Sequence, residues 1–240
     1  MLQSIRIVLV EPSHPGNIGA TARAMKTMGL ASLLLVNPQV RPDAQSIALA
    51  AGASDVLDTL TIVDSLAEAI GDCGLVVGLS NRLRTLAWPA LTPRQGAEVV
   101  LQEVRQYPVA LLFGCERNGL SNAALQQCHY QITIPANPDY SSLNVAMAVQ
   151  IITYELYSAY GEQPTPAVDD LTEYPSVAAL DDFYRHLARV LEKIGFIRPQ
   201  GSGQVLPQCR RLFTRARLEE GELRLWRGIL TAIEKRSRST

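Results

Sequence analysis

Short apolar runs alternate with helical segments over the first 160 residues. Five runs are predicted to be strands, at residues 5–10, 32–36, 75–78, 109–113 and 130–134, and a weaker candidate lies near residues 60–63. Each run is continuously apolar rather than alternating, which is typical of parallel strands covered on both faces. The segments between them predict helices or helix-like turns, at residues 18–28, 43–51, 64–70, 93–106 and 122–127. The pattern predicts an α/β fold with an open, mostly parallel sheet.

A long amphipathic helix is predicted at residues 143–160, after which the composition changes. Residues 161–175 contain three prolines and predict a linker. Apolar positions at helical spacing then predict three more helices, at residues 177–195, 206–216 and 218–234. We therefore expect a domain at residues 1–160, a linker at 161–175 and a small helical appendage at 176–240.

The composition is that of a globular chain, with 47% hydrophobic and 19% charged residues. A largely disordered protein is excluded. Every apolar run is interrupted by a charge before it reaches the ~20 residues that a membrane span needs. The start of the chain runs directly into a strand and lacks the pattern of a secretory signal. We expect a cytoplasmic protein without a membrane partner.

Cysteine and histidine usage argues against a metal site. The four cysteines contain no C-x-x-C pair, and the three histidines contain no H-x-x-x-H pair. Cys128 followed by His129 could begin a metal site. A small buried thiol beside a surface imidazole is the simpler interpretation, and we expect no metal.

The net charge of −1 hides an asymmetry. Residues 1–184 contain 9 Lys/Arg and 18 Asp/Glu, whereas residues 185–240 contain 13 and 5, a net charge of +8. Most of these basic residues are arginines, whose guanidinium group binds phosphate in a bidentate manner. The tail therefore predicts a polyanionic partner, although a solvated helix face would give the same composition.

Four polar or glycine-rich loops follow predicted strands. The first contains Asn17, which could cap a helix, and Arg23 lies six residues further on. The others lie at residues 77–82, 111–120 and 134–149. The common glycine-rich motifs for dinucleotides and for nucleotide phosphates are absent. Because ligands of open α/β sheets bind outside the carboxyl ends of the strands, we expect one composite pocket.

Three of these loops carry a resemblance to a known family. Residues 17–25 read N-x-G-x-x-x-R-A-M, residues 113–120 read F-G-x-E-x-x-G-L, and residues 134–148 read I-P-x-x-x-x-x-S-S-L-N-V-A-x-A. The chain resembles the SPOUT-class RNA ribose 2′-O-methyltransferases over about residues 4–160. The opening stretch 6–28 and the segments A-L-A-A-G-A-S-D (48–55) and R-R-L-F-T-R-A-R (210–217) are more specifically similar to TrmJ-type tRNA methyltransferases. That subfamily methylates the ribose of cytidine or uridine at nucleotide thirty-two of the anticodon loop.

The resemblance implies a fold, a cofactor and partners. The last part of the sheet would be threaded as a deep trefoil knot, S-adenosylmethionine would bind within it, and the catalytic site would form across a homodimer. The residues expected to bind the cofactor are Leu79, Ser80, Asn81, Gly114, Glu116, Gly119, Ile134, Ser141, Ser142 and Leu143. Those expected at the reacting centre are Arg23, Asn17, Ser142, Glu116 and Asn144. The residues expected to contact tRNA are Arg82, Arg84, Arg210, Arg211, Arg215 and Arg217.

The chemistry that the resemblance implies needs no metal. A sulfonium methyl group is already activated, so the enzyme must orient the ribose hydroxyl and ease the loss of its proton. Because guanidinium groups stay protonated in proteins, we expect Arg23 to hold the adjacent phosphate and stabilise the developing alkoxide. Proton loss to water, or through Ser142, stays open.

Three other functions compete with this one. A catalytically inactive RNA-binding protein could use the same fold, and ribosomal RNA could replace tRNA as the substrate. An α/β metabolic enzyme with a small acidic or phosphorylated substrate would explain the sheet but not the basic tail.

Overall fold

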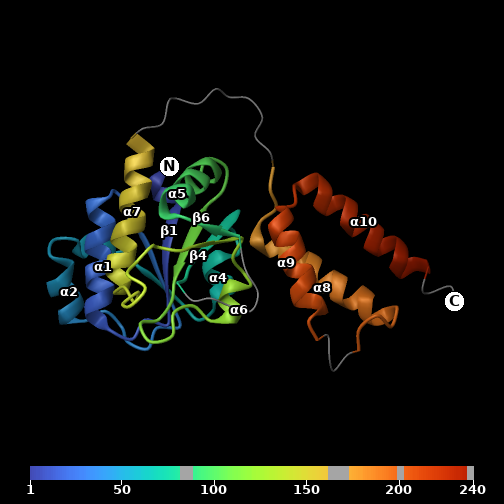
Figure 1. Ribbon diagram of the computed structural model, residues 1–240, viewed down its shortest axis with the longest axis horizontal. Coiled ribbons are helices and arrows are strands. Elements are labelled where there is room, and N and C mark those ends of the chain that lie inside the picture. The colour runs from blue at the N-terminus through green and yellow to red at the C-terminus, as the bar shows by residue number, and fades with distance from the viewer. Residues whose placement is uncertain (82–88, 162–172, 199–202, 237–240) are drawn as a thin grey trace. The chain divides into compact units, whose positions relative to one another are not determined.

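The computed structural model describes residues 1–81, 89–161, 173–198 and 203–236. The chain folds into two compact units, residues 1–168 and 169–240, and Figure 1 labels most of their helices.

The first unit is built on a parallel sheet. Its described strands are β1 (Ile5–Val10), β2 (Ser32–Val36), β3 (Thr61–Val63), β4 (Leu75–Leu79), β5 (Ala90–Leu91), β6 (Val109–Phe113) and β7 (Tyr130–Ile132). Their order is β3-β2-β1-β6-β4-β7-β5, and every pairing is parallel. Strand β6 lies at the centre, where Leu111 is in register with Ile7 on one side and Val77 on the other. The predicted open parallel sheet is confirmed.

Helices cover both faces of this sheet. After a 3-10 turn, η1 (Leu2–Ser4), they are α1 (Pro15–Thr27), α2 (Ala44–Ala50), α3 (Ser54–Asp58), α4 (Leu66–Ile70), α5 (Pro93–Glu103), α6 (Asn122–Leu125) and α7 (Val145–Gly161). Figure 1 shows α1 and α7 on one side of the sheet and α4 and α6 on the other. Helix α7 packs against both α1 and α5. The helix that ends the unit is thereby placed beside the helix that begins it.

The main core lies between the sheet and α1, α5 and α7. Ile7, Leu35 and Leu111 from the strands meet Met25 and Leu156 from the helices, and all five side chains are buried. Burial on both faces explains why the strands read as continuous apolar runs.

Several predicted boundaries need correction. Helix α1 begins at Pro15, with His14 as its N-cap, so Asn17 lies inside the first turn and is not the cap. Proline is favoured at the first helical position. A backbone N–H there has no acceptor within the helix, so the lack of this group in proline loses no hydrogen bond. Strand β5 and helix α3 were not predicted, since two and five residues are too few to show a period.

His129 is buried and is not a surface imidazole. Its Nδ1 accepts a hydrogen bond from the backbone N–H of Val76 at 3.0 Å, and its own backbone N–H donates to the Val76 carbonyl at 2.8 Å. The imidazole thereby satisfies a buried backbone donor of β4. Burial raises the pKa of the neighbouring Cys128 thiol, and all four cysteines are free thiols.

The described residues of the second unit form three helices around a small core. They are α8 (Val177–Lys193), α9 (Val205–Ala216) and α10 (Glu220–Arg236). Phe213 contacts Phe183 edge-on at 5.1 Å between ring centroids and Trp226 at 5.2 Å, which joins all three helices. Most of the proposed linker, residues 162–172, lies outside the described residues.

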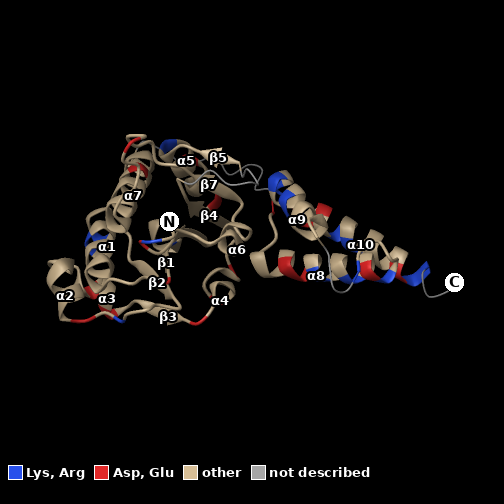
Figure 2. Ribbon diagram, turned by 60° about the horizontal axis from the view of Figure 1, so that its bottom comes forward, with Lys and Arg blue, Asp and Glu red and all other residues tan. Residues whose placement is uncertain are grey.

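The charge of this unit is smaller than that of residues 185–240 alone. Residues 169–184 contain five acidic and no basic residues, so residues 169–240 contain 13 Lys/Arg and 10 Asp/Glu, a net charge of +3. Some of the acidic residues also pair within the unit, as Asp181 does with Arg210 at 2.6 Å. Figure 2 shows basic residues on α9 and at the end of α10, and acidic residues on α8. Lys and Arg residues of the second unit therefore form groups on α9 and at the end of α10 (Figure 2).

Among the described residues, no helix is long and apolar enough to cross a membrane.

Candidate functional site

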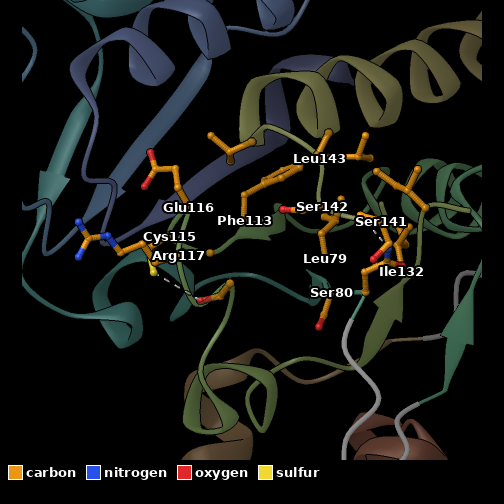
Figure 3. Close-up of a pocket in the computed structure, with 16 residues that line it drawn as sticks. Leu79, Ser80, Phe113, Cys115, Glu116, Arg117, Ile132, Ser141, Ser142 and Leu143 are labelled. Atoms are coloured by element: carbon orange, nitrogen blue, oxygen red, sulfur yellow. Dashed lines mark hydrogen bonds between the residues drawn. The ribbon is translucent and has the colours of Figure 1, made fainter. Parts of the chain in front are cut away.

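A cavity of about 270 Å³ opens at the carboxyl ends of β4, β6 and β7. Its walls come from the segments that follow these three strands, together with the first turn of α7 (Figure 3). Leu79, Phe113 and Ile132, the last residues of the three strands, form its apolar floor. The composite pocket expected from the positions of the polar loops therefore exists.

Every residue predicted to bind the cofactor lines this cavity. They are Leu79, Ser80, Asn81, Gly114, Glu116, Gly119, Ile134, Ser141, Ser142 and Leu143. The sequence did not single out the other lining residues, which are Phe113, Cys115, Arg117, Ile132, Val145 and Ala148. Cys115 and Arg117 occupy variable places of the second motif, so the motif alone gave no reason to choose them.

Hydrogen bonds connect the loop after β4 to strand β7 and to the loop that follows it. Asn81 Nδ2 donates to the Ser141 carbonyl at 3.1 Å. The Ser80 carbonyl accepts from Gln131 Nε2 at 2.9 Å and from Thr133 Oγ1 at 3.1 Å. The loop after β4 is thus fixed by side chains from β7 and from the loop that follows it.

The conformation of the loop after β6 requires two glycines. A Cβ atom on Gly114 would lie 2.0 Å from the carbonyl carbon of Gly119, and Gly119 itself has a φ of +63°. The loop closes on itself through the Gly119 N–H, which donates to the Cys115 carbonyl at 2.8 Å. These glycines allow the tight turn that presents Glu116.

A continuous chain of polar contacts joins three of the predicted catalytic residues. Asn144 Nδ2 donates to Asn17 Oδ1 at 2.9 Å, and Asn17 Nδ2 donates to Glu116 Oε1 at 2.8 Å. Glu116 Oε2 accepts from the Ser13 hydroxyl at 2.7 Å and from the Ser13 backbone N–H at 3.2 Å. The structure thus brings together residues that lie up to 127 positions apart in the chain.

The Glu116 carboxylate is held in its charged form by this chain. Partial burial acts to raise its pKa, but the hydrogen bonds from Ser13 and Asn17 outweigh burial and leave the pKa below its ordinary value. Figure 3 shows the carboxylate apart from the cluster of Leu79, Ser141 and Ser142. The Glu116 side chain therefore lines the cavity, while its two oxygens accept hydrogen bonds from Ser13 and Asn17.

The other two predicted catalytic residues are placed differently. Ser142 is exposed on the cavity wall. Arg23 is exposed on α1 and does not line the cavity. Within one chain, the described geometry does not bring Arg23 into the pocket.

The predicted RNA contacts fall into three groups. Arg82 and Arg84 lie outside the described residues. Arg210 stacks over the Tyr184 ring and Arg217 over the Tyr174 ring, each at 4.4 Å, so both take part in the packing of the second unit. Arg211 and Arg215 are one turn apart on α9, and Arg215 is exposed. Of the described arginines in this group, Arg215 is exposed on α9 and is well placed to meet a polyanion.

The described residues contain no group of three or more His, Cys, Asp or Glu side chains that could hold a metal ion.

Ser13 is a further polar residue of the site that the sequence did not single out. It lies three positions beyond β1, in the segment that enters α1. The available signal was its place after a strand that ends at the same edge as the cavity.

The chain is similar to known proteins over both units. Residues 4–154 match the SpoU rRNA Methylase family, and residues 178–240 match the C-terminal domain of the tRNA methyltransferase TrmJ. A tRNA (cytidine/uridine-2′-O-)-methyltransferase TrmJ from Yersinia pestis (strain Pestoides F) is 57% identical over 242 residues, which cover 99% of this chain and 94% of that protein.

Two solved structures match nearly the whole chain. The crystal structure of TrmJ from Z. mobilis ZM4 has a TM-score of 0.81 at 33% identity and covers 95% of this chain and 98% of its own. The structure of a probable methylase family protein from Haemophilus influenzae Rd KW20 has a TM-score of 0.66 at 48% identity, with 98% of each chain covered.

Proposed function

The chain belongs to the SpoU methylase family, in its TrmJ branch, and we propose that it transfers a methyl group from S-adenosylmethionine to the ribose 2′-hydroxyl of cytidine or uridine in tRNA. The observation that carries this proposal is the cavity at the strand ends, together with the polar chain from Ser13 to Asn144 beside it. The finer assignment, to nucleotide thirty-two of the anticodon loop, follows the TrmJ resemblance of the tail.

The cavity fits S-adenosylmethionine. Apolar side chains such as Leu79 and Leu143 offer surfaces for an adenine ring, and the loops after β4, β6 and β7 present backbone donors and acceptors. The ten residues predicted from the sequence would hold the cofactor. When bound, it supplies an activated methyl group, so no metal is needed for the transfer.

The protein's own residues would orient the ribose and stabilise charge. Ser142, exposed on the cavity wall, is placed to hydrogen-bond the 2′-hydroxyl. Asn17 and Asn144 fix each other, and Asn17 in turn is fixed by Glu116. Arg23 would hold the phosphate beside the target ribose and stabilise the alkoxide as it forms. The proton would leave to water or through Ser142.

The position of Arg23 supports a homodimer. This side chain is exposed outside the cavity of its own chain, so a second copy would have to supply it. Helix α7 exposes Met147, Tyr154 and Tyr157 in the described first unit, an apolar surface of the kind that interfaces bury. We propose that two copies pair through this face.

The trefoil knot is part of the same proposal. Strand β6 returns to the middle of the sheet after β5 has formed its edge, and β7 then crosses to the far side of β4. The segment after β7 contacts the loop after β4 before it reaches α7. We propose that the chain threads through a loop in this region.

The second unit would bind the tRNA. It matches the TrmJ C-terminal domain, and it carries Arg211 and Arg215 on one face of α9. Arginine side chains bind phosphate oxygens independently of sequence, so this unit would supply affinity while the first unit selects the reacting ribose. The proposed domains are 1–160, 161–175 and 176–240, except that helix α7 carries the first one to Gly161. A cytoplasmic location fits a tRNA substrate.

Methyl transfer from labelled S-adenosylmethionine tests the function. Total tRNA from a strain that lacks the corresponding gene should accept label, and mapping should place 2′-O-methylcytidine or 2′-O-methyluridine at nucleotide thirty-two. Tight tRNA binding without transfer would show an inactive RNA-binding protein instead.

Ribosomal RNA is the second candidate substrate, because the family that matches the first unit is described as rRNA methylases. The same assay with ribosomal RNA from that strain separates the two. Label in ribosomal RNA and none in tRNA would overturn the tRNA assignment.

A further inference from the structure

The polar chain beside the cavity has a fixed direction. The Ala146 backbone N–H donates to Asn144 Oδ1 at 2.9 Å, and a backbone N–H can only donate. Asn144 must then present its Nδ2 to Asn17, which in turn presents its Nδ2 to Glu116. An ionised carboxylate can only accept, so both ends of the chain determine how the two amides are turned.

Ser13 stabilises the accepting end. Its hydroxyl and its backbone N–H both donate to Glu116 Oε2, at 2.7 and 3.2 Å, which leaves Oε1 for Asn17. Hydrogen bonds to a charged acceptor are stronger than neutral ones. Two donors on one oxygen hold the carboxylate both in place and in its ionised form.

We propose that Ser13 is a positioning residue of the methyl-transfer site, which acts through Glu116 to fix the orientation of Asn17 and Asn144. Ser13 does not line the cavity, so it would not contact the cofactor. It lies outside the three motifs at residues 17–25, 113–120 and 134–148, in the segment between β1 and α1. The inference rests on the proposed function, because it concerns the same site.

A positioning role for Ser13 predicts an effect on turnover but not on cofactor binding. Without the Ser13 hydroxyl, Glu116 keeps one donor on Oε2 and can turn away from Asn17, so the reacting groups are misaligned more often. Misalignment lowers the rate of the chemical step and leaves cofactor binding nearly unchanged. A structural role alone would instead lower stability without a selective loss of kcat.

The test compares Ser13→Ala with Ser13→Thr, which keeps a hydroxyl donor. We expect Ser13→Ala to lower kcat for tRNA methylation by about tenfold, with the KM for S-adenosylmethionine within about twofold. Ser13→Thr should recover most of the lost rate. Thermal unfolding of each variant shows whether the fold is retained.

A matched control exists in the same unit. The Ser65 hydroxyl donates to Glu68 Oε1 at 2.7 Å, the same type of contact at the start of α4 and outside the cavity. Ser65→Ala should leave kcat unchanged. An equal loss of kcat in Ser65→Ala and Ser13→Ala would overturn the proposal.

A double-mutant cycle tests the route through Glu116. In a Glu116→Ala background the partner of Ser13 is gone, so adding Ser13→Ala should cause no further loss of kcat. Additive losses, or unchanged kcat in Ser13→Ala, would show that Ser13 does not position Glu116. A wild-type enzyme that methylates no RNA would contradict the proposed function itself, which is a separate result.

Discussion

Asn144 Nδ2 lies 2.9 Å from Asn17 Oδ1 and joins the starts of two helices that are 127 residues apart in the chain. Asn17 is in the first turn of α1, and Asn144 directly precedes α7. Both residues belong to sequence motifs that the chain shares with the family, and this contact joins the two motifs in space. Each asparagine determines how the other is turned.

Replacing Asn144 with Asp should disrupt this contact while keeping the shape of the side chain. A carboxylate can still accept from the Ala146 N–H, but it cannot donate to Asn17 Oδ1. We expect methyl transfer to fall by about tenfold or more, with cofactor affinity within about twofold, measured by single-turnover kinetics and calorimetry.

Asn137→Asp is the matched control for Asn144→Asp. Asn137 Oδ1 accepts from the Asp139 N–H at 3.1 Å, a bond that Asp can also make. This variant should keep its activity. Full activity in Asn144→Asp would show that the contact does not matter for catalysis.

Glu116 should make stability depend on pH. Its pKa in the folded protein lies below the ordinary value, because the bonds from Ser13 and Asn17 outweigh partial burial. The charged carboxylate therefore contributes stability above the unfolded pKa, and this contribution is lost as pH falls through the folded pKa. The difference in unfolding free energy between wild type and Glu116→Gln should be largest near pH 7 and should shrink below about pH 4.5.

In Glu116→Gln, neither orientation of the glutamine amide can accept all the hydrogen bonds that the carboxylate accepts. Whichever way its amide turns, one N–H group faces a donor, either Ser13 or Asn17. Denaturant unfolding at several pH values provides the measurement. A difference in stability that does not change between pH 7 and pH 4 would show that the charge of Glu116 is not responsible.

Arg23→Ala should abolish methyl transfer and leave both the fold and cofactor binding intact. The side chain is exposed and lies outside the cavity, so its removal opens no core and touches no cofactor wall. Arg41→Ala, another exposed arginine of the same unit, removes the same charge and should stay active. Substantial turnover in Arg23→Ala would exclude the proposed role.

Removing the second unit should separate RNA binding from cofactor binding. Helix α7 extends to Gly161, and Ala159 packs against the core, so the shortened chain should end after Gly161. The shortened protein should bind S-adenosylmethionine but lose most of its tRNA affinity. Each lost phosphate contact lowers the salt slope of binding by roughly 0.7–0.9, which titrations at two salt concentrations would measure.

A variant of the full chain distinguishes charge from folding in that experiment. Arg211→Ala with Arg215→Ala should weaken tRNA binding and reduce the salt slope without removing the unit. Aggregation of the shortened protein, together with wild-type tRNA binding by the double variant, would indicate that the second unit covers an apolar surface instead.

Gly19→Ala should destabilise the first unit. A Cβ atom there would lie 2.0 Å from the Ser46 carbonyl oxygen, so α1 and α2 would have to move apart. Crowding of this kind costs about 1–3 kcal/mol. Gly228→Ala, in α10 with open space around it, should instead stabilise its helix by about 0.5–1 kcal/mol. Thermal unfolding distinguishes the two, and equal effects would contradict the packing argument.

The amino-acid sequence determined the strands and the loops of the site. The strands at residues 5–10, 32–36 and 109–113 were predicted to the residue, because burial on both faces makes every position in them apolar except Arg6 and Ser32. Seven of the ten residues proposed to bind the cofactor lie in the second and third motifs, at residues 113–120 and 134–148. Each of these motifs is a short stretch of chain, so its spacing can be recognised without knowledge of the fold.

Only the tertiary structure decided which side chains meet. The contact between Ser13 and Glu116 spans 103 residues, and the contact between Asn17 and Asn144 spans 127. Neither pair shows a periodicity or a local spacing that a sequence pattern could reveal. The buried His129, the packing of Arg210 on Tyr184 and the close approach at Gly19 are of the same kind. Local patterns determine which elements form, whereas the order of the strands determines which loops share an edge of the sheet and therefore form one site.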